Sequence, residues 1–174
     1  PSLVGSEMCI RDSLTTHYHQ PFNFTFDGLA ASKAALDKFY NALLRVDKVA
    51  AAETEPDTRL VEALADDLNT PLALSCLHEI VNSLNKAEKP EQQAQLKGLL
   101  LASADLLGLL WQDPQAWFKG AASDETAAIE QKIALRATAK KNKDYALADK
   151  IRDELKASGI ILEDGPQGTT WKKL

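Results

Sequence analysis

The chain has 174 residues, of which 45% are hydrophobic, 6% aromatic and 26% charged, which fits one folded domain with a small appendage. Its 7 Pro and 8 Gly exclude collagen-like and low-complexity proteins, and no apolar stretch approaches the ~20 residues of a membrane span. The net charge of −5 is uneven, because residues 1–131 carry 10 basic and 19 acidic side chains while residues 132–174 carry 10 basic and 6 acidic ones. A basic tail on an acidic body is typical of polyanion-binding proteins, although a solvated helical face gives the same counts.

Residues 1–13 (PSLVGSEMCIRDS) have neither the apolar core of a secretory signal nor a regular hydrophobic period. We therefore interpret them as an extraneous leader and expect them to take no part in the fold. With Cys9 and Cys76 as its two cysteines, the chain can build no disulfide framework, which indicates a reducing, cytoplasmic location.

Helical periodicity predicts the body of the protein between residues 28 and 110. A first helix spans about 28–49 with Asp27 as its N-cap, and the loop 50–57 separates it from a short helix at about 58–67. The next helix begins at Pro71, behind Asn69 or Thr70 as the cap, and runs to about residue 86. The segment 91–110 has leucines on nearly all sides, which predicts the most buried helix of a four-helix bundle.

Beyond residue 110 the pattern predicts a connection and a smaller module. The connection, 111–122, contains Trp111, Trp117 and Phe118 as anchors and a break at Pro114. Helices at about 123–142, capped by Ser123, and at about 144–158 follow, and then two strands, 160–163 and 169–172, joined by the turn 164–168. The predicted fold is an all-α bundle at 28–122, including the linker, with a two-helix plus β-hairpin appendage at 123–174.

No complete active site is recognisable in the residue pattern. His17 and His19 lack the further ligands that zinc requires, so a surface loop is the preferred interpretation. Cys76 and His78 point to different sides of their helix, which favours a buried thiol and a partly exposed imidazole over a catalytic pair. The adjacent carboxylates Asp66 and Asp67 precede a helix start, where negative charge is stabilising.

The last fifty residues combine the three side-chain types that suit a folded RNA. Lysines and arginines neutralise phosphates, aromatic rings stack on unpaired bases, and carboxylates accept hydrogen bonds from base amines. The alternative from composition alone is a mixed-charge helical hairpin. The residues concerned are Lys132, Arg136, Lys140, Lys141, Lys143, Lys150, Arg152 and Lys156, with Tyr145, Asp149, Asp164, Trp171, Lys172 and Lys173.

Three segments resemble cysteinyl-tRNA synthetases, in the order that the family has them. LTTHYHQPFNF (14–24) is similar to the segment that leaves the catalytic domain, and DDLNTP (66–71) resembles the helix entry of the DALR-type bundle. GIILEDGPQGTTW (159–171) is similar to the C-terminal ending of the bacterial family. The resemblance covers about residues 14–174, so that 14–27 corresponds to the connection from the catalytic domain and 123–174 to an anticodon-binding module.

The nucleotide-binding motifs and zinc ligands of the family's catalytic domain are missing from the chain. The resemblance therefore implies the C-terminal third of an enzyme that uses ATP and zinc in its catalytic domain. We expect the chain to need no cofactor and to have no catalytic activity alone. We also expect it to be a monomer and not to associate with membranes. Its expected partners are the cysteine tRNA and the missing catalytic domain.

The resemblance also implies which residues contact the anticodon. Asp149 and Asp164 match carboxylates implicated in base contacts, Tyr145 stands in place of a stacking Trp, and Lys140 stands in place of an Arg. Backbone phosphate contacts are expected from Lys141, Lys143 and Lys172. Trp171 is expected to pack the hairpin against the preceding helix.

Alternative functions from other classes remain open at this point. One is a stand-alone helical RNA-binding protein derived from the synthetase, and another is a protein-interaction bundle without an RNA role. The cysteine ligases of small-thiol synthesis are a third, but they lack the ending at 159–171.

Overall fold

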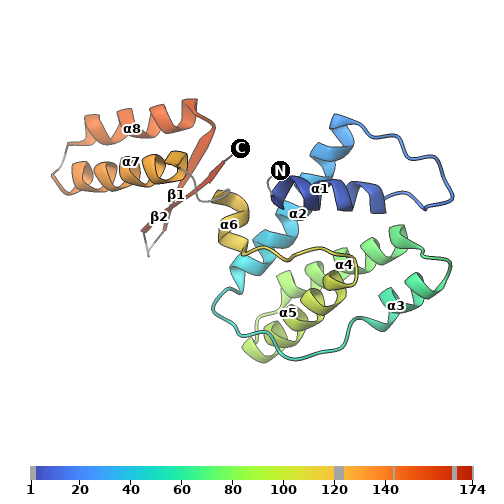
Figure 1. Ribbon diagram of the computed structural model, residues 1–174. Helices are drawn as coiled ribbons and strands as arrows, with labels where there is room; N and C mark the ends of the chain where they lie inside the picture. Colours follow the sequence, from blue (N-terminus) through green and yellow to red (C-terminus); the bar gives the residue numbers. More distant parts are fainter. Residues whose placement is uncertain (1–2, 120–123, 143, 166–167, 174) are drawn as a thin grey trace. The chain divides into compact units, whose positions relative to one another are not determined.

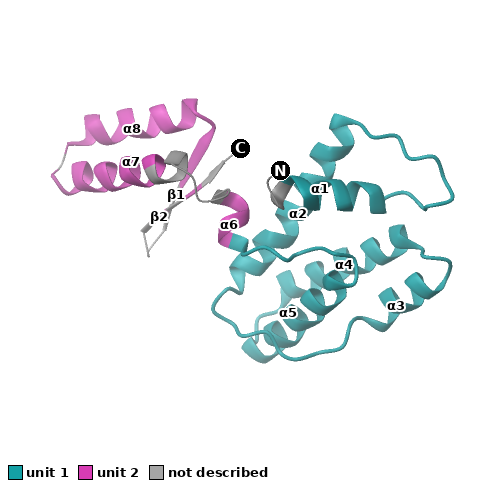
Figure 2. Cartoon of the chain, in the orientation of Figure 1, with its two compact units in different colours: residues 1–114 teal, residues 115–174 magenta. Residues whose placement is uncertain are grey.

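The computed structural model describes residues 3–119, 124–142, 144–165 and 168–173, with side chains at 3–4, 119, 124–127, 163–165, 168, 170 and 172–173 left outside the description. The chain divides into two compact units, residues 1–114 (unit 1) and 115–174 (unit 2), which Figure 2 shows in different colours. Neither unit contains, in its described part, a helix long and apolar enough to cross a membrane.

Unit 1 is a helical bundle, as predicted (Figure 1). The helix α4 contacts α2, α3 and α5, and it buries Leu77, Ile80 and Leu84 among other apolar side chains. Phe39 and Tyr40 of α2 are completely buried in the same core. The bounds are α1 (Leu3–Leu14), α2 (Phe26–Arg45), α3 (Thr58–Ala65), α4 (Thr70–Lys86) and α5 (Pro90–Asp105).

Local chemistry explains where the bundle helices begin. The Asn69 side chain accepts a hydrogen bond from the Leu72 N–H at 3.2 Å, and Pro71 lies in the first turn, which confirms the predicted start of α4. The predicted Asp27 cap of α2 is wrong, because Thr25 Oγ1 accepts from the Gly28 N–H at 3.0 Å. Asp27 instead lies in the first turn, where its charge still favours the helix dipole.

The expectation that the segment 91–110 forms the most buried helix is wrong. The helix α5 ends at Asp105 and buries four residues, whereas α2 and α4 bury seven each. Leu96, Leu99 and Leu101 are only partly buried, because one side of α5 faces away from the bundle. Leu109 and Leu110 are buried but lie beyond the helix end.

The expectation that residues 1–13 take no part in the fold is also wrong. Residues Leu3–Leu14 form the helix α1, which packs against α2 and α4. Among the described side chains of α1, those of Glu7, Arg11 and Asp12 are buried, at 5%, 9% and 5% exposed. Because these buried side chains are charged, the described part of α1 shows no hydrophobic period that would reveal the helix in the sequence.

The buried face of α1 is held by hydrogen bonds to the bundle. Tyr40 Oη donates to Glu7 Oε2 at 2.8 Å, and the backbone N–H of Leu110 donates to Glu7 Oε1. Arg11 Nη1 donates to Ser32 Oγ at 3.2 Å, and Ser32 Oγ donates to Asp12 Oδ1 at 3.3 Å. Burial and the hydrogen bond to Glu7 raise the pKa of Tyr40, so this phenol stays protonated as a donor.

His78 of α4 makes the stability of unit 1 dependent on pH. Arg11 Nη2 donates to its Nε2 at 3.3 Å, and its ring lies edge-on to Phe39. Burial and the nearby Arg11 charge lower the pKa of His78 below the usual 6.5. The unfolded chain therefore binds a proton more readily than the folded one as the pH falls through this value.

We expect the free energy of unfolding to decrease when the pH is lowered from about 7.5 to about 5.5. A urea titration at the two pH values measures the change, and His78→Gln should reduce it. An unchanged pH dependence in His78→Gln would contradict the assignment.

Unit 2 consists of helices and a hairpin. Pro114 takes the first position of a short helix, α6 (Pro114–Lys119), so the predicted connection 111–122 is partly helical. The elements α7 (Asp124–Lys141), α8 (Tyr145–Ala157), β1 (Ile160–Gly165) and β2 (Gly168–Lys173) follow, and the predicted appendage is thereby confirmed. The predicted cap Ser123 lies outside the described residues.

The hairpin pairs antiparallel, with Leu162 opposite Trp171 and Gly165 opposite Gly168, so its strands reach further into the predicted turn than expected. Trp171 is only 4% exposed and packs in one apolar cluster with Ile151, Leu155 and Ile160. The prediction that Trp171 packs the hairpin against the preceding helix is confirmed. Its indole is therefore part of the core of unit 2 and is not an exposed stacking surface.

Candidate nucleic-acid interface

Four of the predicted site residues, Lys140, Lys141, Tyr145 and Asp149, lie at the end of α7 and in the first turns of α8. The two helices lie side by side, joined by residues 142–144 (Figure 1). Asp144 Oδ1 accepts from the Leu147 N–H at 3.1 Å and so caps α8, while the Asp144 N–H donates to Ala139 O at 2.9 Å. These two bonds fix the end of α7 against the start of α8, and Lys140, Lys141 and Tyr145 flank this corner.

One exposed stripe of α8 carries an aromatic ring, a carboxylate and a guanidinium. Tyr145 is 63% exposed, and Asp149 and Arg152 are exposed one and two turns further along. Their spacing of four and then three residues places them on the same face of the helix. The other face of α8 is buried, through Ala148, Ile151 and Leu155.

The structure places some of the predicted residues and leaves others undescribed. Lys140, Lys141, Tyr145 and Asp149 are exposed at the corner or along the stripe. The backbone of Asp164 lies opposite Thr169 and that of Lys172 opposite Ile161, but both side chains lie outside the described residues. Lys143 also lies outside them.

Two basic residues of the same module have structural contacts. Arg136 is 4% exposed, and its Nη1 donates to Thr169 Oγ1 of the hairpin at 3.5 Å. Lys132 Nζ forms an ion pair with Glu154 of α8 at 3.2 Å. Sequence reasoning included Lys132, Arg136 and Arg152 among the basic residues of the module but assigned Arg152 no role at the site. The seven-residue spacing from Tyr145 is the signal that identifies Arg152.

We name the surface formed by Lys140, Lys141, Tyr145, Asp149 and Arg152 the α7–α8 corner. It offers cations for phosphates, a ring for base stacking and a carboxylate that can accept from a base amine. These are the contacts that single-stranded RNA loops require.

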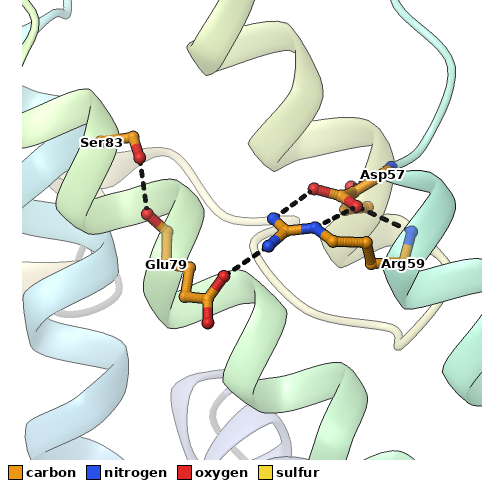
Figure 3. Close-up of polar contacts among 5 residues, drawn as sticks. Asp57, Arg59, Glu79 and Ser83 are labelled. Carbon is orange, nitrogen blue, oxygen red and sulfur yellow. Dashed lines mark hydrogen bonds and ion pairs between the residues drawn. The ribbon is translucent and has the colours of Figure 1, made fainter.

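Unit 1 carries a second polar cluster, which joins α3 to α4. Asp57 Oδ1 accepts from the Arg59 N–H at 2.9 Å, and Asp57 Oδ2 accepts from Arg59 Nη2 at 2.9 Å (Figure 3). Arg59 Nη1 reaches Glu79 Oε2 of α4 at 2.5 Å. The Arg59 guanidinium holds the pKa of Asp57 below its usual value, and its carboxylate partners raise the pKa of Arg59.

A surface hollow of about 430 Å³ lies beside this cluster. Arg59 supplies its positive charge and is already paired with two carboxylates, while Glu62, Asp66 and Glu79 line the rest of its charged wall. The excess of carboxylates is unfavourable for a phosphate, so this hollow does not compete with the α7–α8 corner as an RNA site. Across the described residues, no group of three or more His, Cys, Asp or Glu side chains could hold a metal ion.

The His17-Tyr18-His19 segment lies against the turn between α3 and α4. Tyr18 Oη donates to Asp67 Oδ1 at 2.6 Å, and His17 Nε2 lies 2.8 Å from the Asp67 carbonyl oxygen. His19 Nε2 is 3.7 Å from Asp67 Oδ2. Asp67 therefore holds the connecting segment as well as preceding a helix, a role that its sequence position alone did not indicate.

Comparison with known proteins gives one domain match in unit 1 and similarity to one kind of enzyme over most of the chain. The family model of the DALR domain matches residues 59–111, which include α4, α5 and all of α3 except its first residue. The cysteine–tRNA ligase of Paramagnetospirillum magneticum is 53% identical over 165 residues, and that of Rhodospirillum rubrum is 47% identical over 164 residues. The ligase of Vibrio cholerae is 41% identical over 165 residues.

Each of these matches covers 92% of this chain but only 36% of the relative. The similarity therefore includes most of both units, while the chain spans about a third of the length of the proteins it resembles. Residues 59–111 thus match the DALR domain, and 92% of the chain is similar to about a third of each of these cysteine–tRNA ligases.

Proposed function

We propose that the chain is the C-terminal, tRNA-binding part of a cysteine–tRNA ligase and that the α7–α8 corner contacts the anticodon of the cysteine tRNA. The observation that carries this proposal is the exposed stripe of Tyr145, Asp149 and Arg152 beside the lysines that end α7. The identity to cysteine–tRNA ligases over 92% of the chain supports it.

Each residue type at the corner has a distinct task in this proposal. Lys140, Lys141 and Arg152 neutralise backbone phosphates, which supplies affinity without reading the base sequence. Tyr145 stacks on an unpaired anticodon base, and the Asp149 carboxylate accepts from an exocyclic amine, which reads the base.

In the full-length enzyme, this part would orient the tRNA for the reaction that forms cysteinyl-tRNA. Binding energy at the anticodon would then help to place the distant acceptor end. The ATP and zinc that the resemblance implies belong to the part of the enzyme that this chain does not span. We further propose that the protein acts in the cytoplasm as a monomer.

Replacing Tyr145 separates stacking from electrostatic attraction. Tyr145→Ala should weaken binding of the cysteine tRNA by about 1–3 kcal/mol, the usual contribution of one stacked base, whereas Tyr145→Phe should retain most of the affinity. Fluorescence titration with labelled tRNA measures both constants. Equal losses in the two variants would contradict stacking.

Replacing a lysine should have a different signature. Lys141→Ala should weaken binding of any tRNA alike, and it should reduce the slope of log affinity against log salt by about one. Lys89→Ala in unit 1, which removes an exposed lysine at the start of α5, is the control and should change neither quantity. If neither lysine variant differs from wild type in tRNA affinity or salt dependence, the basic residues only face solvent. The alternative of a protein-interaction bundle without an RNA role would then be preferred.

A further inference from the structure

Four aromatic side chains are open to solvent within nine residues, between α1 and the first turn of α2. Phe24 and Phe26 lie edge to face, with their ring centroids 6.5 Å apart. By contrast, Phe39, which lies further along α2, is fully buried. Clustered exposed apolar side chains mark surfaces that a partner covers. We name residues 18–26 the aromatic strip, in which the exposed fractions are 59% for Tyr18, 42% for Phe22, 52% for Phe24 and 85% for Phe26.

The aromatic strip is anchored at both ends. At its start, the Tyr18 hydroxyl donates to the Asp67 carboxylate at 2.6 Å, next to the contact of His17 with the Asp67 carbonyl oxygen. At its end, Thr25 caps α2 through the Gly28 N–H. The rings are thus presented by a segment with fixed ends, and a partner would pay little additional ordering entropy to bind it.

The charge around the strip indicates the chemistry of the partner. The sequence contains no Lys or Arg between Arg11 and Lys33, so the strip lacks the cations that neutralise phosphates. Asp67 lies at its start and Asp27 directly after it, which further disfavours an RNA backbone. An apolar protein surface is the occupant that these side chains fit.

The relatives contain a large part that could supply such a surface. The matches take in 92% of this chain but 36% of each relative, so most of a full-length ligase lies outside the matched part. We propose that the aromatic strip docks onto an apolar surface of the part of a full-length cysteine–tRNA ligase that this chain does not span. This inference rests on the proposed function, and it adds the surface through which the bundle is held against the rest of the enzyme.

Docking at this strip would have a mechanical consequence. The strip leads directly into α2, whose Phe39 and Leu43 belong to the core that α2 shares with α4. A docked strip would therefore fix the bundle to the remainder of the enzyme, so that orientation of the tRNA is not lost through a flexible joint.

Hydroxyl-radical footprinting with mass spectrometry tests the occupant directly. The two samples are the 174-residue chain and the full-length ligase of Paramagnetospirillum magneticum with its matched part replaced by this chain. Oxidation of Phe22, Phe24 and Phe26 should fall in the full-length protein to the low level of buried Phe39. The reference side chains are Leu72 and Leu106, which are 49% and 51% exposed and should be oxidised equally in both samples.

Two footprinting results would overturn the proposal. Equal oxidation of the three phenylalanines in both samples would show that the missing part does not cover the strip. Protection that appears in the free chain as its concentration rises would show that a second copy is the occupant.

A kinetic measurement gives a second, independent test. The triple variant Phe22→Ser/Phe24→Ser/Phe26→Ser in the full-length protein should lower kcat for cysteinylation by roughly tenfold to a hundredfold, because the tRNA is no longer positioned. Its affinity for tRNA should not change, and neither should the unfolding temperature of the free chain. The control triple variant, at Val61, Leu72 and Leu106, which are 44%, 49% and 51% exposed, should leave kcat unchanged.

A strip variant whose kcat equals that of the control would also overturn the proposal. If the proposed function is wrong, the unmodified protein will not bind tRNA. The footprinting experiment contains no tRNA, so it tests the docking of the strip independently of tRNA binding.

Discussion

Glu7→Ala should lower the free energy of unfolding of unit 1 by about 1–3 kcal/mol, the cost of a buried polar group that loses its charged partner. The Glu7 carboxylate accepts from the Tyr40 hydroxyl, from the Leu110 N–H and from Gln112 Nε2 at 3.1 Å. In the variant, these donors either stay buried without an acceptor or are exposed when α1 detaches. Deletion of residues 1–13 should therefore have an effect of similar size.

Thermal unfolding followed by circular dichroism measures this loss, at about 4–8 °C for each kcal/mol in a domain of this size. Ser6→Ala is the matched control, since Ser6 lies beside Glu7 but is exposed. A Glu7→Ala midpoint equal to that of Ser6→Ala would show that α1 is not docked in solution. Residues 1–13 would then be the extraneous leader that their sequence indicates.

Gly98→Ala should destabilise unit 1 by about 1–3 kcal/mol, the usual cost of overpacking a close contact. Helix propensity alone predicts the opposite sign, because alanine in a helix interior is favoured over glycine by about 1 kcal/mol. The Cβ of an alanine at position 98 would lie only 2.0 Å from the Ala52 carbonyl oxygen. The loop cannot retreat freely, because the Ala52 N–H donates to Ala94 O at 3.0 Å.

Gly5→Ala in α1 is the control for this change. An added Cβ at Gly5 meets nothing within 4 Å, so propensity alone acts and the variant should be at least as stable as wild type. Urea unfolding of both variants measures whether each substitution raises or lowers the free energy of unfolding. Stabilisation by Gly98→Ala would mean that α5 and the loop at 50–57 are further apart than the structure has them.

The sequence predicts those elements whose signals are local. Asn69 followed by Pro71 marks the start of α4 because the cap and the missing N–H act within one turn. The hairpin follows from alternation around a turn, and the burial of Trp171 follows from the hairpin's need for a hydrophobic partner. The helix α1 could not be predicted, because its buried Glu7 and Arg11 find partners that are distant in sequence.

At the candidate site, too, the features with a local sequence signal could be predicted, and the contacts between residues distant in sequence could not. Helical spacing alone places Tyr145 and Asp149 on one face of α8, and the structure agrees. The burial of Arg136 depends on where the hairpin packs, and the contact of Tyr18 with Asp67 joins residues 49 positions apart. Neither contact has a local signal, so both required the structure.

Binding of two tRNAs by Asp149→Asn tests the central claim, that the α7–α8 corner reads the anticodon. Wild-type protein should bind the cysteine tRNA more tightly than the same tRNA with an altered anticodon, and Asp149→Asn should narrow this difference by about 1–3 kcal/mol. Glu154→Gln, which changes the carboxylate paired with Lys132 elsewhere on α8, is the control and should leave the difference intact. Equal affinity of the wild-type protein for both tRNAs, or an Asp149→Asn variant that tightens both alike, would contradict the account.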